Sequence, residues 1–168
     1  MNSSLDISRM NKQSTNPALR FIAFLLRPNT GSTLSDIGAL ILRAGTGLFI
    51  AGFHGWHKLA QGVAYLQHGT HWPLLDDVEG LGLPFAVLGA FAATVTQLLG
   101  GLAVATGFFT RFAALAVTMS LLVAAYSNLL MAKENQLALL YALLFAGFTF
   151  YGGGRYSVDA ILFESRSR

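Results

Sequence analysis

Four basic side chains lie in an apolar stretch, residues 40–61, that is long enough to cross a membrane. Arg43 lies near the start of this stretch, and His54, His57 and Lys58 lie near its end. A charged side chain at the centre of a membrane helix costs on the order of 3 kcal/mol on insertion scales. Each of these residues therefore needs a partner in the protein, a route to the aqueous boundary, or a ligand.

The two histidines are three residues apart, a spacing that places both on one face of an α-helix, beside Lys58. Neutral imidazole can donate and accept hydrogen bonds, so this group could hydrogen-bond to a quinone-like ring or exchange protons with it. His68 and His71 repeat the spacing in the following loop. A metal site needs a third ligand, and we predict no metal site here. A polar cluster satisfied at the membrane interface is the alternative interpretation.

Arg43 suits either an anionic or carbonyl ligand or a structural ion pair. Snorkelling of its long side chain to the headgroups is a third interpretation. Asp159 follows the last apolar stretch and falls on the same side of the membrane as Arg43. Because a cation in hydrocarbon favours a nearby anion, the sequence predicts direct contact between Arg43 and Asp159.

Gln97 is an isolated polar side chain in the middle of a second apolar stretch. Its amide is expected to hydrogen-bond across to the third apolar stretch, or else to line a cavity with Thr94 and Asn128. Such bonds contribute only about 0.6 kcal/mol in a bilayer, so Gln97→Leu is expected to fold with little loss. The candidate ligand-binding residues are Arg43, His54, His57, Lys58 and Gln97.

The composition indicates that lipid surrounds these stretches. Of the 168 residues, 54% are hydrophobic and 11% are charged, well below the quarter or so that is usual in soluble domains. Small residues four apart, such as Gly47, Ala51 and Gly55, form ridges that allow close helix packing in lipid. The sequence predicts an all-α, four-helix transmembrane bundle with its longest loop at 62–83. Its predicted spans are 37–61, 84–108, 112–131 and 136–151.

The segments outside these spans are short. Residues 1–35 are predicted to comprise a disordered start and an interfacial amphipathic helix at 17–28, and residues 164–168 a polar tail. Residues 36–163 form the membrane domain. Most Lys and Arg residues fall on one side of the four spans, which predicts cytoplasmic N- and C-termini.

Two classes of function are excluded by composition. The net charge of +3 comes from scattered basic residues, so nucleic-acid binding is not expected. The chain has no cysteine, so it can hold no disulfide, thiolate metal site or thiol redox centre of its own.

Three ordered motifs resemble the DoxX family over roughly residues 36–163. Arg43-x-x-x-Gly47 followed by HGWHKL at 54–59 resembles the family's first span. QLLGGLAVATGFFTRFAAL at 97–115 is similar to its second-to-third helix hairpin, and GGGRYSVDAIL at 152–162 to its C-terminal signature. Family members often carry Glu where this chain has Gln97. The motif positions carried over by this resemblance are Arg43, His54, Lys58, Arg111, Arg155 and Asp159.

The resemblance implies a small four-span protein. Founding members of the family belong to a membrane thiosulfate:quinone oxidoreductase, and others are linked to thiol or oxidative-stress systems. The expectation is a multi-pass protein of the bacterial inner membrane that is a subunit or partner of a quinone-linked oxidoreductase, with quinone and other subunits as partners. A non-enzymatic membrane partner or assembly protein is the main alternative, and a small carrier is a weaker one. Whether the chain is itself an enzyme, and whether it forms a homo-oligomer, is left open.

Overall fold

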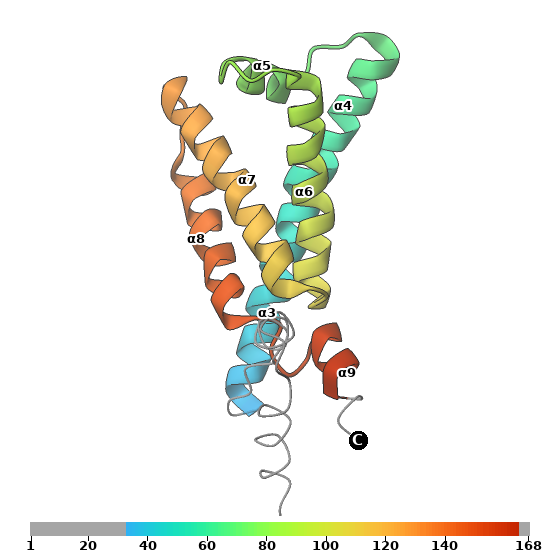
Figure 1. Cartoon of the computed structure of the whole chain (residues 1–168), viewed down its shortest axis with the longest axis vertical. Coiled ribbons are helices and arrows are strands. Elements are labelled where there is room, and N and C mark those ends of the chain that lie inside the picture. Colours follow the sequence, from blue (N-terminus) through green and yellow to red (C-terminus); the bar gives the residue numbers. More distant parts are fainter. Residues whose placement is uncertain (1–32, 165–168) are drawn as a thin grey trace, which may run out of the picture.

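The computed structural model describes residues 33–164 of the chain (Figure 1). Every regular element in this part is a helix. The start of the chain, including the predicted interfacial helix at 17–28, and the last residues, 165–168, lie outside the described residues.

The first helix is longer than predicted and changes its winding midway. It consists of α3 (Thr33–Phe49), a π-helical segment η1 (Ile50–Trp56) and α4 (His57–His68), 36 residues in all. It ends at Gly69, whose φ of +64° suits a residue without a Cβ. The predicted span of 37–61 therefore ends too early, because the helix continues through residues 62–68 to His68.

The prediction that residues 62–83 form one irregular loop is wrong. Its first residues belong to α4, and α5 (Pro73–Glu79) forms in its second half. Proline suits the first position of a helix, because its φ is fixed and its missing N–H would be unsatisfied there. Trp72 is buried just before it and packs 4.8 Å from Phe91, centroid to centroid, which anchors α5 to the bundle.

Four further helices follow. They are α6 (Ala86–Thr106), α7 (Thr110–Leu130), α8 (Gln136–Tyr151) and the short α9 (Val158–Glu164). The first three agree with the predicted spans to within about two residues at each end. The sequence analysis does not predict α9.

Three helices in the described part are long and apolar enough to cross a membrane, namely Thr33–His68, Ala86–Thr106 and Thr110–Leu130. The apolar α8 has 16 residues, or about 24 Å, which is short of a hydrocarbon core of about 30 Å. Large apolar side chains such as Phe53 and Phe150 are exposed on these helices, as expected where lipid is the solvent. The described part of the chain is thus all-helical, and its apolar helices are those of a membrane protein.

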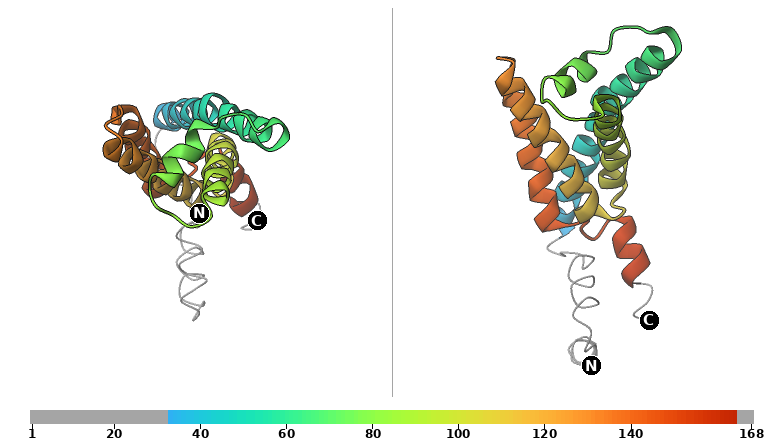
Figure 2. Two further views of the ribbon diagram at one scale, coloured as in Figure 1. Left: turned by 90° about the horizontal axis from the view of Figure 1, so that it is seen from above. Right: turned by 45° about the horizontal axis from the view of Figure 1, so that its top comes forward.

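The helices converge at one end and diverge at the other. The long first helix packs against α6, α6 packs against α7, and α7 forms an antiparallel pair with α8 (Figure 1). At the lower end in that view the helices approach α9. At the upper end α7 and α8 lean away from α4 and α6, and α5 lies across the space between them (Figures 1 and 2). This divergence leaves room for a cavity beneath α5.

The crossing of α3 and α6 depends on glycine. A Cβ added at Gly47 would lie 2.6 Å from the carbonyl oxygen of Gly101, and one added at Gly55 would lie 2.6 Å from the Cα of Leu98. Such distances leave no space for a methyl group, so the backbones are in direct contact. The predicted small-residue ridges are confirmed as helix-packing surfaces.

Gly47→Ala should therefore lower the free energy of unfolding by about 1–3 kcal/mol, because the two backbones must separate to admit the methyl group. Gly45→Ala is the matched control, since nothing lies within 4 Å of a Cβ at that position. It should be neutral or slightly stabilising, because alanine favours helix over glycine. Unfolding in mixed detergent micelles measures both, and equal effects at the two positions would contradict the packing described here.

Candidate functional site

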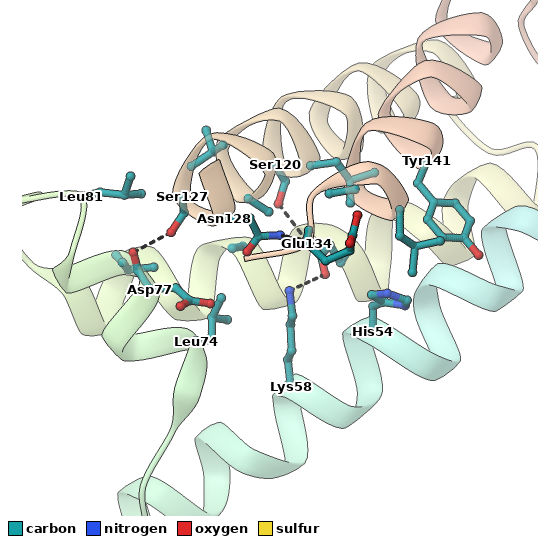
Figure 3. A pocket seen from close by; sticks show the side chains of 18 residues that line it. His54, Lys58, Leu74, Asp77, Leu81, Ser120, Ser127, Asn128, Glu134 and Tyr141 are labelled. Atoms are coloured by element: carbon teal, nitrogen blue, oxygen red, sulfur yellow. Dashed lines mark hydrogen bonds between the residues drawn. The ribbon is translucent and has the colours of Figure 1, made fainter. Parts of the chain in front are cut away.

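A cavity of about 210 Å³ lies beneath α5, between the diverging helices. Its walls come from η1 and α4, α5, α6, α7 and α8, and they are mostly apolar. Figure 3 shows His54 and Lys58 entering it from the first helix, opposite Ser120 and Asn128 of α7. A cavity that gathers polar groups from every long helix is the natural place for a ligand.

A chain of three polar side chains crosses this cavity. The Lys58 ammonium Nζ donates a hydrogen bond to Gln97 Oε1 at 3.1 Å, and Gln97 Nε2 donates to Ser120 Oγ at 3.4 Å. Gln97 itself is 1% exposed. The prediction that its amide bonds to the third span is confirmed. The sequence analysis does not predict that the same amide also holds Lys58.

Within the described part of the chain, Lys58 makes a hydrogen bond only to a neutral group, and the Asp77 carboxylate acts on its charge without contacting it. Among the described residues, the ion pairs are His71–Asp76 and Lys133–Asp77, so neither includes Lys58. Its single hydrogen-bond partner is the Gln97 amide, and an ammonium carries three N–H donors. The cavity therefore contains a half-buried cation with donors to spare.

The histidines take different positions, and the predicted shared face is wrong. His54 lines the cavity, with its ring 5.8 Å from that of Tyr141, centroid to centroid. Its Nδ1 is buried and has no hydrogen-bond partner. His57 is exposed and lies 3.1 Å from Gln61, Nε2 to Nε2. The wider turn of η1, which ends at Trp56, is the reason, because the rule for residues three apart assumes α-helical winding.

The rim of the cavity ties α5 to α7 and to the turn that follows it. Ser127 Oγ donates to the backbone oxygen of Asp77 at 3.0 Å, and the side chains of Lys133 and Asp77 form an ion pair. Asn128 Nδ2 donates to the backbone oxygen of Glu134 at 3.1 Å. These contacts hold α5 over the cavity.

The sequence analysis did not select several residues of this site. Ser120, Asp77, Glu134 and Tyr141 all line the cavity. For Ser120 a signal exists, since it is a polar residue inside an apolar span like Gln97. Asp77 and Glu134 lie in connecting segments whose position depends on how the helices diverge, which no local pattern encodes.

Arg43 lies at the opposite, convergent end of the molecule and does not line the cavity. It is 2% exposed, and its guanidinium donates to three backbone carbonyls. The Nη1 atom reaches Val104 O at 2.6 Å and Ala105 O at 3.1 Å, and Nη2 reaches Tyr156 O at 2.9 Å. Arg43 thus binds the last turn of α6, where carbonyls lack intrahelical partners and a cation is favourable.

Asp159 binds the start of α7 rather than Arg43. Its carboxylate accepts hydrogen bonds from Phe109 N at 2.7 Å, Thr110 N at 2.9 Å and Thr110 Oγ1 at 2.8 Å. The predicted direct Arg43–Asp159 pair is therefore wrong. Each charge instead satisfies the backbone groups of a helix end on either side of Gly107, and a Cβ at Gly107 would lie 2.5 Å from Arg43 Nη1.

The two remaining motif arginines also lie at this convergent end. Arg111 is buried in the first turn of α7, close to Gly152, and Arg155 is exposed. The motif positions thus divide between two places. His54 and Lys58 belong to the cavity, and Arg43, Arg111, Arg155 and Asp159 belong to the joint that connects α3, the α6–α7 turn and the C-terminal segment.

Gln97→Leu should cost more than the sequence predicts, about 1–2 kcal/mol. The substitution removes the hydrogen bond to Ser120 and also the one acceptor that Lys58 has within the described part of the chain. The double variant Lys58→Met, Gln97→Leu should be closer to the wild type, since it leaves no unpartnered charge. Unfolding in micelles compares the three proteins. A double variant less stable than Gln97→Leu alone would show that the contact is not what holds Lys58.

Comparison with known proteins supports the motifs of the first span and of the second-to-third helix hairpin, whereas the motif at 152–162 lies outside the matched region. A family model described as DoxX matches residues 38–131, which is more than half of the chain. No curated protein and no solved structure matches the chain. The matched region runs from α3 to the end of α7 and includes Lys58, Gln97 and Ser120 of the cavity. The chain belongs to the DoxX family.

Proposed function

We propose that this protein is an integral subunit or partner of a quinone-linked oxidoreductase system in the bacterial inner membrane, and that the cavity beneath α5 binds the polar ring of a quinone. The observation that carries the proposal is the set of unused donors in a mostly apolar cavity. Lys58 retains free N–H groups, and the buried Nδ1 of His54 has no partner. A quinone carbonyl is an acceptor that matches both.

The size of the cavity supports a ring rather than a whole lipid-soluble molecule. At about 210 Å³ it is smaller than typical pockets for drug-sized ligands, which are roughly 300–1,000 Å³. A ring would fit inside it, and an isoprenoid tail would extend into the surrounding lipid. Tyr141 provides an aromatic wall beside His54, suitable for contact with a flat ring.

The electron-transfer step belongs to a partner in this proposal. The chain has no cysteine, and its cavity residues supply binding, orientation and protons rather than electrons. We therefore assign quinone binding to this chain and the oxidation of a sulfur or thiol substrate to another subunit. A purely non-enzymatic membrane partner would need no such cavity.

Binding of a quinone in lipid nanodiscs tests the proposal. The purified wild-type protein should carry co-purified quinone and, after its removal, bind added ubiquinone with a short tail. His54→Phe should weaken this binding by about tenfold or more, because it removes a facing nitrogen. The matched control is His57→Phe, three residues along the same helix but outside the cavity, which should bind like the wild type. A wild-type protein that neither retains nor binds quinone would refute the proposal.

We further propose four spans with cytoplasmic N- and C-termini. The end of the molecule that carries α5 contains Asp76, Asp77, Glu79 and Glu134, whereas Arg111 and Arg155 lie at the other end, which the positive-inside rule assigns to the cytoplasm. The short α8 would span by local thinning of the bilayer.

A topology reporter fused after Arg168 should read as cytoplasmic, and one inserted beside Asp76 as external. Both reporters on one side of the membrane would remove the four-span arrangement.

A further inference from the structure

We infer that the cavity selects an anionic ring, one that carries an ionised hydroxyl group, and holds its negative oxygen against Lys58 and Ser120. The inference rests on the proposed function and specifies the charge of the ligand that the same site prefers. It concerns binding only and includes no redox step.

The first support is the position of Lys58. Its ammonium enters the cavity from α4 and meets one neutral acceptor, Gln97 Oε1 at 3.1 Å. Of the two ion pairs in the described part of the chain, neither reaches it. A cation in a mostly apolar cavity inside a membrane protein is unfavourable unless something neutralises it. A bound anion would supply that charge, whereas a neutral carbonyl would supply only a hydrogen bond.

The second support is the arrangement of the other polar groups. Ser120 and His54 face the cavity beside Lys58, and both can donate a hydrogen bond. The acidic lining residues do not contact the ammonium, although the Asp77 carboxylate attracts it from the rim of the cavity. Asp77 is paired with Lys133, and Glu134 is exposed on the turn between α7 and α8. The positive, donor-rich end of the cavity therefore lies inside, and its negative end lies at the rim.

The third support is Gln97, whose neutral amide contacts Lys58 without neutralising its charge. Its amide oxygen touches Lys58 while its amide nitrogen is directed to Ser120. A carboxylate of the same shape at this position would contact the ammonium directly and neutralise it. Gln97→Glu is thus an internal competitor for the proposed anion, and it changes no volume.

The test uses two ring ligands that differ by one methyl group and, as a result, in charge. One is 2-hydroxy-1,4-naphthoquinone, which is ionised at neutral pH, and the other is 2-methoxy-1,4-naphthoquinone, which cannot ionise. Titration of the full-length protein in nanodiscs should give at least tenfold tighter binding of the hydroxy compound. Lys58→Met and Gln97→Glu should each bring this ratio to near one, because each lowers the affinity for the hydroxy compound far more than the affinity for the methoxy compound. His57→Phe should keep the wild-type ratio.

The outcomes separate this inference from the proposed function. Equal binding of the two compounds by the wild-type protein would overturn the inference and leave quinone binding standing. Binding of neither compound would overturn both. Gln97→Glu retains Lys58, so its fold does not depend on removing a charge. A preference for the hydroxy compound that survives in this variant would show that Lys58 is not the selecting group. If a straight-chain fatty acid anion displaced the bound hydroxy compound as effectively as more of that compound does, the requirement for a ring would be overturned.

Discussion

Asp159→Ala should lower the free energy of unfolding by about 3 kcal/mol, one of the two largest effects expected for a single side chain in this protein. The carboxylate is 5% exposed and accepts three hydrogen bonds, two of them from backbone N–H groups at the start of α7. The residue that precedes this helix, Phe109, has no side-chain oxygen with which to cap it. Asp159 supplies the cap from the far end of the chain, and its charge is favourable at a helix N-terminus.

Two further variants make the prediction specific. Asp159→Asn retains one carbonyl oxygen as an acceptor and should lose about half as much stability. Asp76→Ala removes an exposed carboxylate that pairs with His71, and it should change the free energy of unfolding by less than about 0.5 kcal/mol. Stabilities measured by denaturation in mixed micelles compare the three. An Asp159→Ala protein within 0.5 kcal/mol of the wild type would mean that the start of α7 needs no cap.

The sequence was sufficient for α6, α7 and α8 because their signals are local. Apolar runs, the charged turn at Lys133 and Glu134, and glycine ridges such as Gly47 and Gly55 gave the spans and the contact faces of α3 and α6. The end of the first helix was missed because residues 62–68, which begin with glycine and end with Gln67 and His68, are compatible with either helix or loop. The π-helical winding of η1 was missed because no residue type in Ile50–Trp56 requires it.

The cavity was partly accessible to sequence reasoning. A polar residue in the middle of an apolar span must find a partner, which correctly led to Gln97 and its bond to α7. The identity of its second partner, Lys58, depends on how far α4 and α6 diverge, and this distance follows from the packing of whole helices. The same limit explains why His57 was assigned to the site and Tyr141 was not.

The charges at the convergent end show why matching opposite charges can mislead. Arg43 and Asp159 were assigned to each other because both are charged and both fall on one side of the membrane. Helix ends carry partial charges and unsatisfied backbone groups of their own, which also compete for charged side chains. Here Arg43 donates hydrogen bonds to carbonyls at the end of α6, and Asp159 accepts a hydrogen bond from a backbone amide at the start of α7.

Arg43→Met should lower the free energy of unfolding by about 3–5 kcal/mol, because it removes the charged donor that three carbonyl groups of a buried joint share. The guanidinium connects α3 to the end of α6 and, through Tyr156, to the segment before α9. Arg43→Lys keeps the charge, but a single ammonium lacks the wide fork that reaches these carbonyls, so an intermediate loss is expected. Arg155→Met, which removes an exposed arginine from the same segment as Tyr156, should be close to the wild type.

The double variant Arg43→Met, Asp159→Ala distinguishes this joint from a direct ion pair. If the two side chains neutralised each other, removing both would be milder than removing either one, because no unpaired charge would remain. In the observed geometry each side chain satisfies a different set of backbone groups, so the losses should accumulate. The double variant should therefore be less stable than both single variants, and denaturation in micelles measures the order. A double variant more stable than Arg43→Met alone would restore the ion pair as the reason that these two charges lie at one end of the protein.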